Sequence, residues 1–235
     1  MTFNKSTELY MGDIFQDSIA HIDCKRIPNF EITCREIKNI QGIADLLCIP
    51  EKSLKPDELE FIKEIDQSLS LSEAKVISLL KKKSNRTIDF LTRNTGYSAL
   101  RIQTICNKLE ARNILASTKG NHYLISSNLP NQVPIWAFEL KLKDWKRALF
   151  QATQYKSFAS YVYTVFPFNM KNVISKNAER FKKLNIGIIF FDPINLDFEI
   201  LLYSTKNYSR SRLSHVYSLF SLASEFNNKE VCIPF

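Results

Sequence analysis

The pattern of apolar and polar residues predicts an α/β chain. Apolar residues recur at helical spacing over residues 6–23 and alternate with polar ones over 30–37, as in a half-buried strand. A mostly apolar run at 43–49 predicts a second, buried strand. Further along, strands are expected at 134–143, 161–166, 187–191 and 198–203, and helices at 144–158, 175–184 and 210–227. This order indicates a mixed α/β sheet flanked by helices.

The middle of the chain has a different pattern. Apolar spacing predicts three short helices, over 72–83, 87–94 and 99–113, with Ser72 as the cap of the first. Residues 114–125 then predict a β-hairpin. We therefore expect a small helical segment within the α/β chain.

Composition limits the class of protein. The chain has 235 residues, of which 45% are hydrophobic and 24% charged, an ordinary globular balance. No apolar run reaches the roughly 18 residues of a membrane span, and the first residues lack an apolar signal core. Its five cysteines are odd in number and include no C-x-x-C pair, which favours reduced, mostly buried thiols. We expect a cytoplasmic protein with no membrane contact.

Positive charge is concentrated in the helical middle. The net charge is +8, and the stretch from Glu73 to His122 holds ten basic residues against three acids. The basic residues are Lys75, Lys81, Lys82, Lys83, Arg86, Arg93, Arg101, Lys108, Arg112 and Lys119. Such a stretch favours nucleic acid as a partner, with a solvated surface as the alternative.

Three helices followed by a hairpin, in a basic segment of this length, resemble a winged helix-turn-helix. That family places its third helix in the DNA major groove and its wing on the backbone or in the minor groove. The resemblance implies DNA contacts from the start and exposed side of the third helix and from the wing tip. These candidates are Tyr97, Ser98, Arg101, Gln103, Thr104, Lys108, Lys119, Asn121 and His122. Some winged helices bind proteins, so a structural role is the alternative.

The run from Pro134 to Lys143 carries a candidate for chemistry. Trp136, Phe138, Leu140 and Leu142 alternate with Ala137, Glu139, Lys141 and Lys143. In a strand, Glu139 and Lys141 therefore point to the same side. A carboxylate beside an ammonium can hold a divalent cation and stabilise charge on a nearby phosphate.

Two further motifs accompany Glu139-Leu140-Lys141. Asp45 lies on the second predicted strand, and Gln151-x-x-x-Tyr155 lies on one face of the helix after Lys141. This order of elements and motifs resembles the PD-(D/E)xK, or restriction-endonuclease-like, nuclease superfamily. The proline that usually precedes the aspartate is replaced here by Ala44.

The resemblance implies a site for Mg²⁺, for which Mn²⁺ would substitute. The metal-binding positions would be Asp45, Glu139 and Leu140. Lys141 would assist the attacking water or stabilise the transition state, and Gln151 would hold the lysine or a phosphate. The accessory candidates are Glu36 and Tyr155, with Glu8 and Asp13 as possible outer ligands.

The domain expectation follows from an unusual spacing. Asp45 and Glu139 are 94 residues apart, whereas the family has a short hairpin connection between these strands. The basic segment fills the gap. We therefore expect a winged-helix domain over 67–128, inserted into a discontinuous nuclease-like domain of 1–66 and 129–235.

These resemblances imply a metal-dependent DNA endonuclease that hydrolyses phosphodiester bonds in double-stranded DNA, in a setting such as restriction or phage defence. A homodimer is expected, since duplex cleavage needs two active centres. One alternative is a non-catalytic DNA-binding transcriptional regulator that uses the nuclease-like scaffold for dimerisation or ligand sensing. Another is a protein-interaction module in a multi-subunit defence or mobile-element complex.

Overall fold

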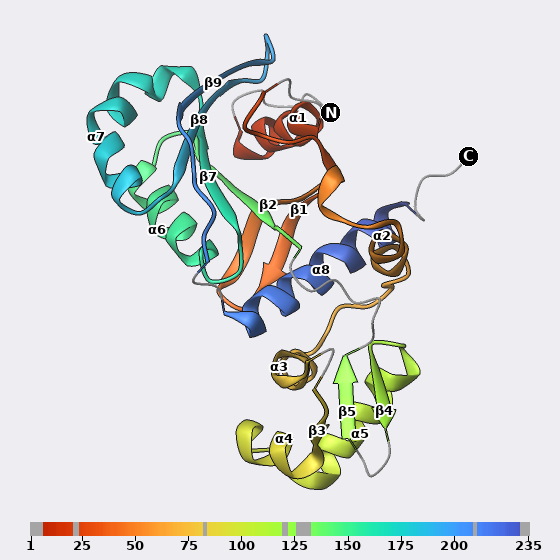
Figure 1. Ribbon diagram of the computed structural model, residues 1–235. Coiled ribbons are helices and arrows are strands. Elements are labelled where there is room, and N and C mark those ends of the chain that lie inside the picture. Colours follow the sequence, from red (N-terminus) through yellow and green to blue (C-terminus); the bar gives the residue numbers. More distant parts are fainter. Residues whose placement is uncertain are drawn as a thin grey trace. The chain divides into compact units, whose positions relative to one another are not determined.

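A computed structural model describes residues 7–20, 24–81, 84–118, 122–125, 133–208 and 211–230 (Figure 1). Contacts divide the chain into two compact units. The first consists of Met1–Ser53 and Val133–Ser211, and the second of Leu54–Gln132 and Arg212–Phe235. No helix in the described ranges is long and apolar enough to cross a membrane.

The first unit is built on a six-stranded mixed sheet, which confirms the predicted α/β class. Its strand order is β1-β2-β6-β7-β8-β9. β1 and β2 form an antiparallel hairpin, β2 is antiparallel to β6, β6 to β8 run parallel, and β9 is antiparallel to β8. The strands are β1 Phe30–Asn39, β2 Gly42–Pro50, β6 Trp136–Leu140, β7 Tyr161–Phe166, β8 Gly187–Asp192 and β9 Asp197–Leu202.

Helices cover both faces of this sheet (Figure 1). α1 (Glu8–Ala20) packs Met11, Phe15 and Ile19 into a core cluster with Phe138 of β6 and Phe191 of β8. The other face is covered by α6 and α7. The remaining helical elements of this unit are α6 Trp145–Tyr155, α7 Lys171–Lys183, and the short 3-10 turns Glu51–Ser53 and Phe168–Met170.

The expectation that β6 is half-buried was wrong, because all five of its residues are buried. β6 lies between β2 and β7, and a helix covers each of its faces. Phe138 faces the cluster with α1. On the other face, the buried Ala148 and Ala152 of α6 let that helix approach closely enough to enclose Glu139. Asp144 caps α6 by accepting the Arg147 amide at 3.0 Å.

The second unit contains five helices in the described ranges and a three-stranded antiparallel sheet of order β3-β5-β4. α3 begins two residues earlier than expected, because Ser70, and not Ser72, accepts the Glu73 amide in a capping box. α4 ends at Gly96, whose φ of 76° favours glycine. The elements are α2 Pro56–Lys63, α3 Leu71–Leu79, β3 Arg86–Thr87, α4 Ile88–Thr95, α5 Ala99–Ala111, β4 Leu115–Thr118, β5 His122–Ile125 and α8 Arg212–Glu230.

The division into units differs from the expected boundaries at two places. Residues 54–66 and α8 had been assigned to the sheet domain, whereas the contacts group both with the helical unit. The Asn227 side chain of α8 donates to the carbonyls of Ile62 and Ile65 at 3.0 and 2.6 Å. These bonds tie α8 to carbonyls at and just after the end of α2.

The close packing of Gly187 against the ring of Tyr163 can be tested by a substitution. Gly187 pairs with Tyr163, and a Cβ at Gly187 would lie 2.2 Å from the ring carbon Cδ1 of Tyr163. That ring is buried and stacks on Trp136 and Phe138. We expect Gly187→Ala to lower the free energy of unfolding by about 1–3 kcal/mol through overpacking, as measured by urea denaturation.

A double-mutant cycle checks that cause. In a Tyr163→Leu background the ring is gone, so Gly187→Ala should cost much less. An equal cost in both backgrounds would show that the ring is not what opposes the added methyl group.

Candidate functional site

The ammonium of Lys141 is buried among three carboxylates. Its Nζ lies 2.8 Å from Glu139 Oε1, 3.4 Å from Glu8 Oε2 and 3.5 Å from Asp45 Oδ2. Glu139 is 0% exposed, whereas the side chain of Asp45 is 28% exposed. We call Glu8, Asp45, Glu139, Lys141 and Tyr155 the Lys141 cluster. It lies entirely within the first unit.

Backbone pairing brings the distant acids together. β2 and β6 are antiparallel neighbours, with Leu46 opposite Phe138. The amide of Leu140 donates to Asp45 Oδ2 at 2.9 Å, which ties the two strands through a side chain. Lys141 Nζ in turn donates to the Leu140 carbonyl at 3.0 Å. Residues almost a hundred positions apart therefore meet at the end of one strand.

Helix α1 adds Glu8, which had been only a possible outer ligand. Glu8 Oε1 accepts the amide of Leu142 at 3.4 Å, while its other oxygen faces Lys141. Arg35 of β1 donates to the Leu9 carbonyl at 2.9 Å and pairs with Asp13, so that α1 is fastened to the sheet. Asp13 is thereby engaged outside the cluster.

Tyr155 orients the buried glutamate. Its hydroxyl donates to Glu139 Oε2, and the Ile43 carbonyl lies 3.2 Å from the same hydroxyl. Gln151, one turn earlier on α6, forms no described hydrogen bond with Lys141, and its Oε1 is buried without a partner in the described residues. Glu36 is exposed and is likewise not bonded to the cluster. The structure thus brings together Asp45, Glu139, Lys141 and Tyr155, but not Glu36.

The protonation of the cluster follows from burial and mutual charge. Burial, with the charge of Asp45 second, raises the pKa of Glu139 from 4.5 to about 7, although Lys141 and Tyr155 act in the opposite direction. Burial also opposes the charge of Lys141, but the carboxylates of Asp45, Glu139 and Glu8 outweigh it and raise the lysine's pKa. Lys141 therefore remains a cation at neutral pH.

The cluster has the donor chemistry of a hard-cation site. Carboxylate and carbonyl oxygens are the ligands that Mg²⁺ prefers. Asp45, Glu139 and the carbonyl of Leu140 all face the single ammonium of Lys141, so they converge on one region. Among the described residues, however, no three His, Cys, Asp or Glu side chains are arranged as a metal site. A fit to Mg²⁺ would rest on two carboxylates and one carbonyl.

In the second unit, the residues expected to contact DNA lie along α5 and the turn before it. Arg101 is exposed, and its Cζ lies 4.2 Å from the ring centre of Tyr97. Lys75 of α3, which is one of the ten basic residues of the segment but not one of the expected DNA contacts, lies 5.2 Å from the same ring. Two cations thus share one aromatic ring at the start of α5. Ser98 and Thr104 are also exposed, and Gln103 is half-buried.

Lys108 has a structural partner. Its Nζ lies 2.7 Å from Oε1 of Glu73, whose side chain is only 5% exposed on α3. Burial opposes ionisation of Glu73, but the bonds from Lys108 and Ser70 outweigh it and lower the pKa of the carboxyl. Lys108 therefore fastens α5 to α3. Lys119, Asn121 and the side chain of His122 lie outside the described residues.

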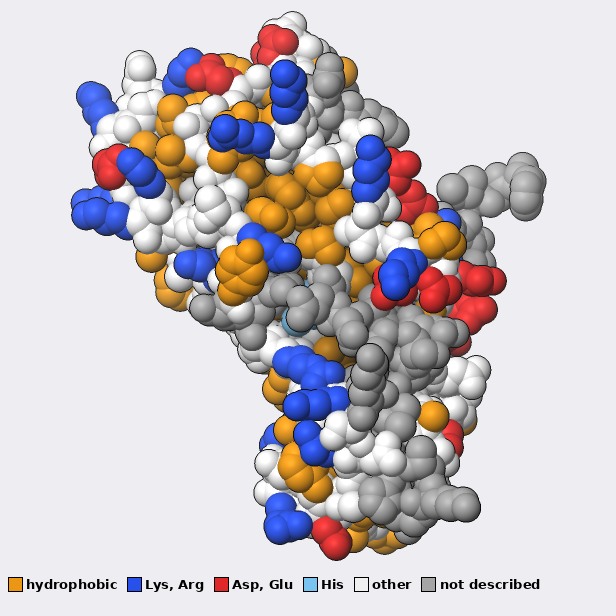
Figure 2. Space-filling model, in the orientation of Figure 1, with side chains coloured by type: hydrophobic (Ala, Val, Ile, Leu, Met, Phe, Trp, Pro, Cys, Tyr) orange, Lys and Arg blue, Asp and Glu red, His pale blue; other side chains and the backbone are white. Residues whose placement is uncertain are grey.

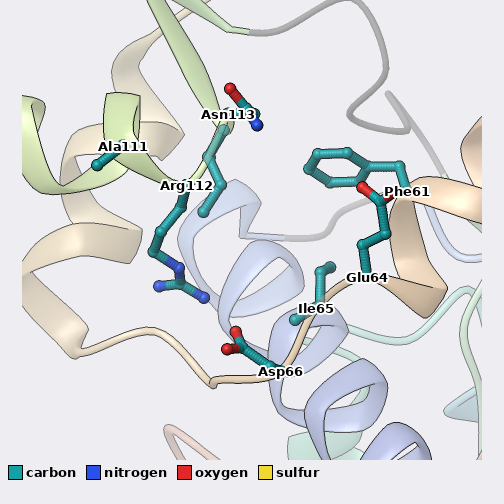
Figure 3. Close-up of a pocket in the computed structure, with 8 residues that line it drawn as sticks. Phe61, Glu64, Ile65, Asp66, Ala111, Arg112 and Asn113 are labelled. Carbon is teal, nitrogen blue, oxygen red and sulfur yellow. The ribbon is translucent and has the colours of Figure 1, made fainter.

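A cavity of about 270 Å³ lies within the second unit (Figure 3). Arg112 and Asp66 extend toward the same space in Figure 3, and Arg112 Nη2 donates to the Gln67 carbonyl at 2.6 Å. The cavity is lined by one cation, Arg112, and two acids, Glu64 and Asp66, so its charge favours no single class of ligand. The lining residues are Phe61, Glu64, Ile65, Asp66, Ala111, Arg112, Asn113 and Ile114.

The raised pKa of Glu139 predicts a pH dependence of stability. The folded protein binds this proton more tightly than the unfolded chain does, so stability falls as pH rises from about 4.5 to 7. Glu139→Gln has no carboxyl to ionise at this position, so the variant does not lose this part of its stability as pH rises. We expect the melting temperature of the variant, relative to wild type, to be higher at pH 8 than at pH 5.

Thermal denaturation at the two pH values measures this difference. Glu199→Gln, at a half-exposed glutamate of β9 that pairs with Lys171, controls for the loss of one carboxylate. A Glu139→Gln difference that is the same at both pH values would contradict a protonation change at Glu139.

No known protein family, curated protein or solved structure matches this chain. The arrangement of its own residues is therefore what bears on its function.

Proposed function

We propose that the chain is a metal-dependent DNA endonuclease of the PD-(D/E)xK type, directed to DNA by a winged-helix unit. One observation carries the proposal: Asp45, Glu139 and Lys141 converge at the junction of β2 and β6 although 94 residues separate the two acids. Acidic residues that occur by chance on surface strands are solvated and far from one another, whereas Asp45 and Glu139 enclose the buried ammonium of Lys141. A homodimer remains part of this proposal, because two centres are needed to cut a duplex.

The order of elements supports both parts of the proposal. The first unit runs α1, β1, β2, β6, α6, β7, with an antiparallel triplet followed by a parallel strand. This is the order expected of a restriction-endonuclease-like core. The second unit contains α3, β3, α4, α5, β4, β5, with an antiparallel three-stranded sheet. That order is the one expected of a winged helix-turn-helix.

The cluster suggests a division of roles during hydrolysis. Mg²⁺, when bound, supplies polarisation of the phosphate and a water of lowered pKa. Asp45, Glu139 and the Leu140 carbonyl would hold it. The neighbouring carboxylates raise the pKa of Lys141, and as a cation it would donate to charge that develops on the phosphate oxygens. Tyr155 keeps Glu139 turned toward Lys141.

A regulator without nuclease activity is the second candidate, and two observations favour it. Glu139 is completely buried, and Asp45 Oδ2 already accepts a backbone amide. Lys141 alone partly neutralises the acids in this state. Such a cluster would serve as a structural ion pair, and DNA binding would persist without any cleavage.

Cleavage of supercoiled plasmid in Mg²⁺ or Mn²⁺ separates the two candidates. We expect Lys141→Gln and Asp45→Asn each to lower the rate of nicking by about 100-fold or more, because each removes charge that the transition state requires. Glu199→Gln, at the half-exposed glutamate of β9, is the matched control and should cut at the wild-type rate. Absence of cutting by wild type, or equal cutting by Lys141→Gln, would refute the nuclease.

DNA binding by the second unit is measured separately, by fluorescence anisotropy in EDTA. Arg101→Ala should weaken binding to a duplex by about tenfold, because it removes an exposed cation positioned by Tyr97. Lys38→Ala, at an exposed lysine of β1, is the control and should change little. Unchanged affinity in Arg101→Ala would argue that α5 does not contact DNA.

A further inference from the structure

A second concentration of positive charge lies on the first unit, outside the Lys141 cluster. Residues 143–184 hold nine basic residues and two acids, an excess as large as that of the winged-helix segment. Figure 2 shows Lys and Arg side chains over the part of the surface where Figure 1 draws α6 and α7. Seven of these nine basic residues are exposed, and one of the seven, Lys182, pairs with Glu179. We call the other six the basic face: Lys143, Lys146, Arg147, Lys176, Arg180 and Lys183.

Trp145 joins the two halves of this face. Lys146 Nζ of α6 and Arg180 Cζ of α7 lie 5.9 and 5.7 Å from the centres of its ring system. The same ring system packs against the buried Phe181 at 6.2 Å, which fixes it between the helices. Cations stacked on an aromatic ring are oriented without losing their charge. The Trp145 ring system therefore links a cation of α6 to a cation of α7.

The basic face is not neutralised by its own neighbours. Throughout the described part of the chain, none of the six forms an ion pair. Of the two acids in the stretch, Asp144 caps α6 and Glu179 pairs with Lys182 at 3.5 Å. Like charges crowded in this way repel one another, so the arrangement lowers the stability of the free protein.

The placement of two of these cations also opposes the helix dipole. Lys146 and Arg147 occupy the first turn of α6, which contains no acid. The positive end of a helix favours acids and disfavours cations. The two cations therefore cost local helix stability, which the capping carboxylate of Asp144 offsets only in part.

We propose that the basic face binds the phosphate backbone of duplex DNA beside the cleavage site, an inference that rests on the proposed nuclease function. Lys143 follows Lys141 by two residues, so the face begins next to the cluster. Lys176, Arg180 and Lys183 are spaced i, i+4, i+7 along one side of α7 and span about 10 Å. That length matches about three phosphates of one strand. The substrate would thus be a duplex that extends past the cut.

Charge-removing variants that leave Trp145 untouched test this surface. In Lys143→Gln/Lys176→Gln/Lys183→Gln, affinity for a 30-base-pair duplex should fall by about tenfold or more at 0.1 M salt. The slope of log affinity against log salt should become shallower by about 2.7, since each phosphate contact contributes about 0.9. The matched control Lys25→Gln/Lys38→Gln/Lys52→Gln removes three exposed lysines elsewhere in the first unit and should leave the slope unchanged.

A single variant excludes misfolding as the cause. Arg147→Glu places an acid three residues after the cap Asp144, which suits the helix dipole. We expect its melting temperature to rise by about 1–4 °C while its affinity for the duplex falls by about tenfold. A variant that is more stable than wild type but binds the duplex more weakly cannot owe its lower affinity to unfolding.

The outcomes separate this inference from the proposed function. If wild type cuts plasmid and both basic-face variants bind duplex as it does, the basic face is not a DNA surface and the nuclease proposal stands. If wild type neither binds nor cuts DNA, both proposals fail. Loss of binding to phosphatidylserine vesicles, with duplex affinity intact, would assign the basic face to a membrane surface instead and overturn the inference.

Discussion

The burial of the Lys141 ammonium is the interaction around which the first unit is organised. An isolated ammonium in such a place is costly, and it is tolerated only because carboxylates surround it. Those carboxylates come from α1, β2 and β6, so the ion cluster links elements that the chain visits far apart. Tyr155 of α6 completes the enclosure from the other side of the sheet. Three carboxylates face one ammonium, so the acids are in excess and the loss of one of them brings the charges closer to balance.

This constraint also accounts for the unusual character of β6. A strand buried on both faces normally reads as continuously apolar. β6 instead carries Glu139, which is tolerated because Lys141 and Tyr155 supply its partners and because its pKa is raised to about 7. A carboxyl that ionises near neutrality is sensitive to any added positive charge. The charge of Glu139 therefore depends on the charges placed around it.

The sequence predicted local features better than tertiary ones. The strand expected at 161–166 coincides with β7, and the order of strands and helices correctly predicted a mixed sheet. The start of α3 was misplaced although Ser70-x-x-Glu73 is a readable capping box. The covering of Glu139 by α6 depends on the small side chains of Ala148 and Ala152, whose effect appears only after packing. Glu8 could not be assigned, since nothing local marks a helical acid that will meet a strand over a hundred residues away.

The interleaving of the two units has a consequence for how the protein is made. The chain leaves the sheet unit after Ser53, returns at Val133, and leaves again at Arg212 to add α8 to the helical unit. During synthesis, β1 and β2 must wait for β6 and its neighbours, and the helical unit must wait for its final helix. Neither unit is complete until almost the whole chain has emerged from the ribosome. The Lys141 cluster, in particular, cannot assemble until the entire segment between Asp45 and Glu139 has been translated.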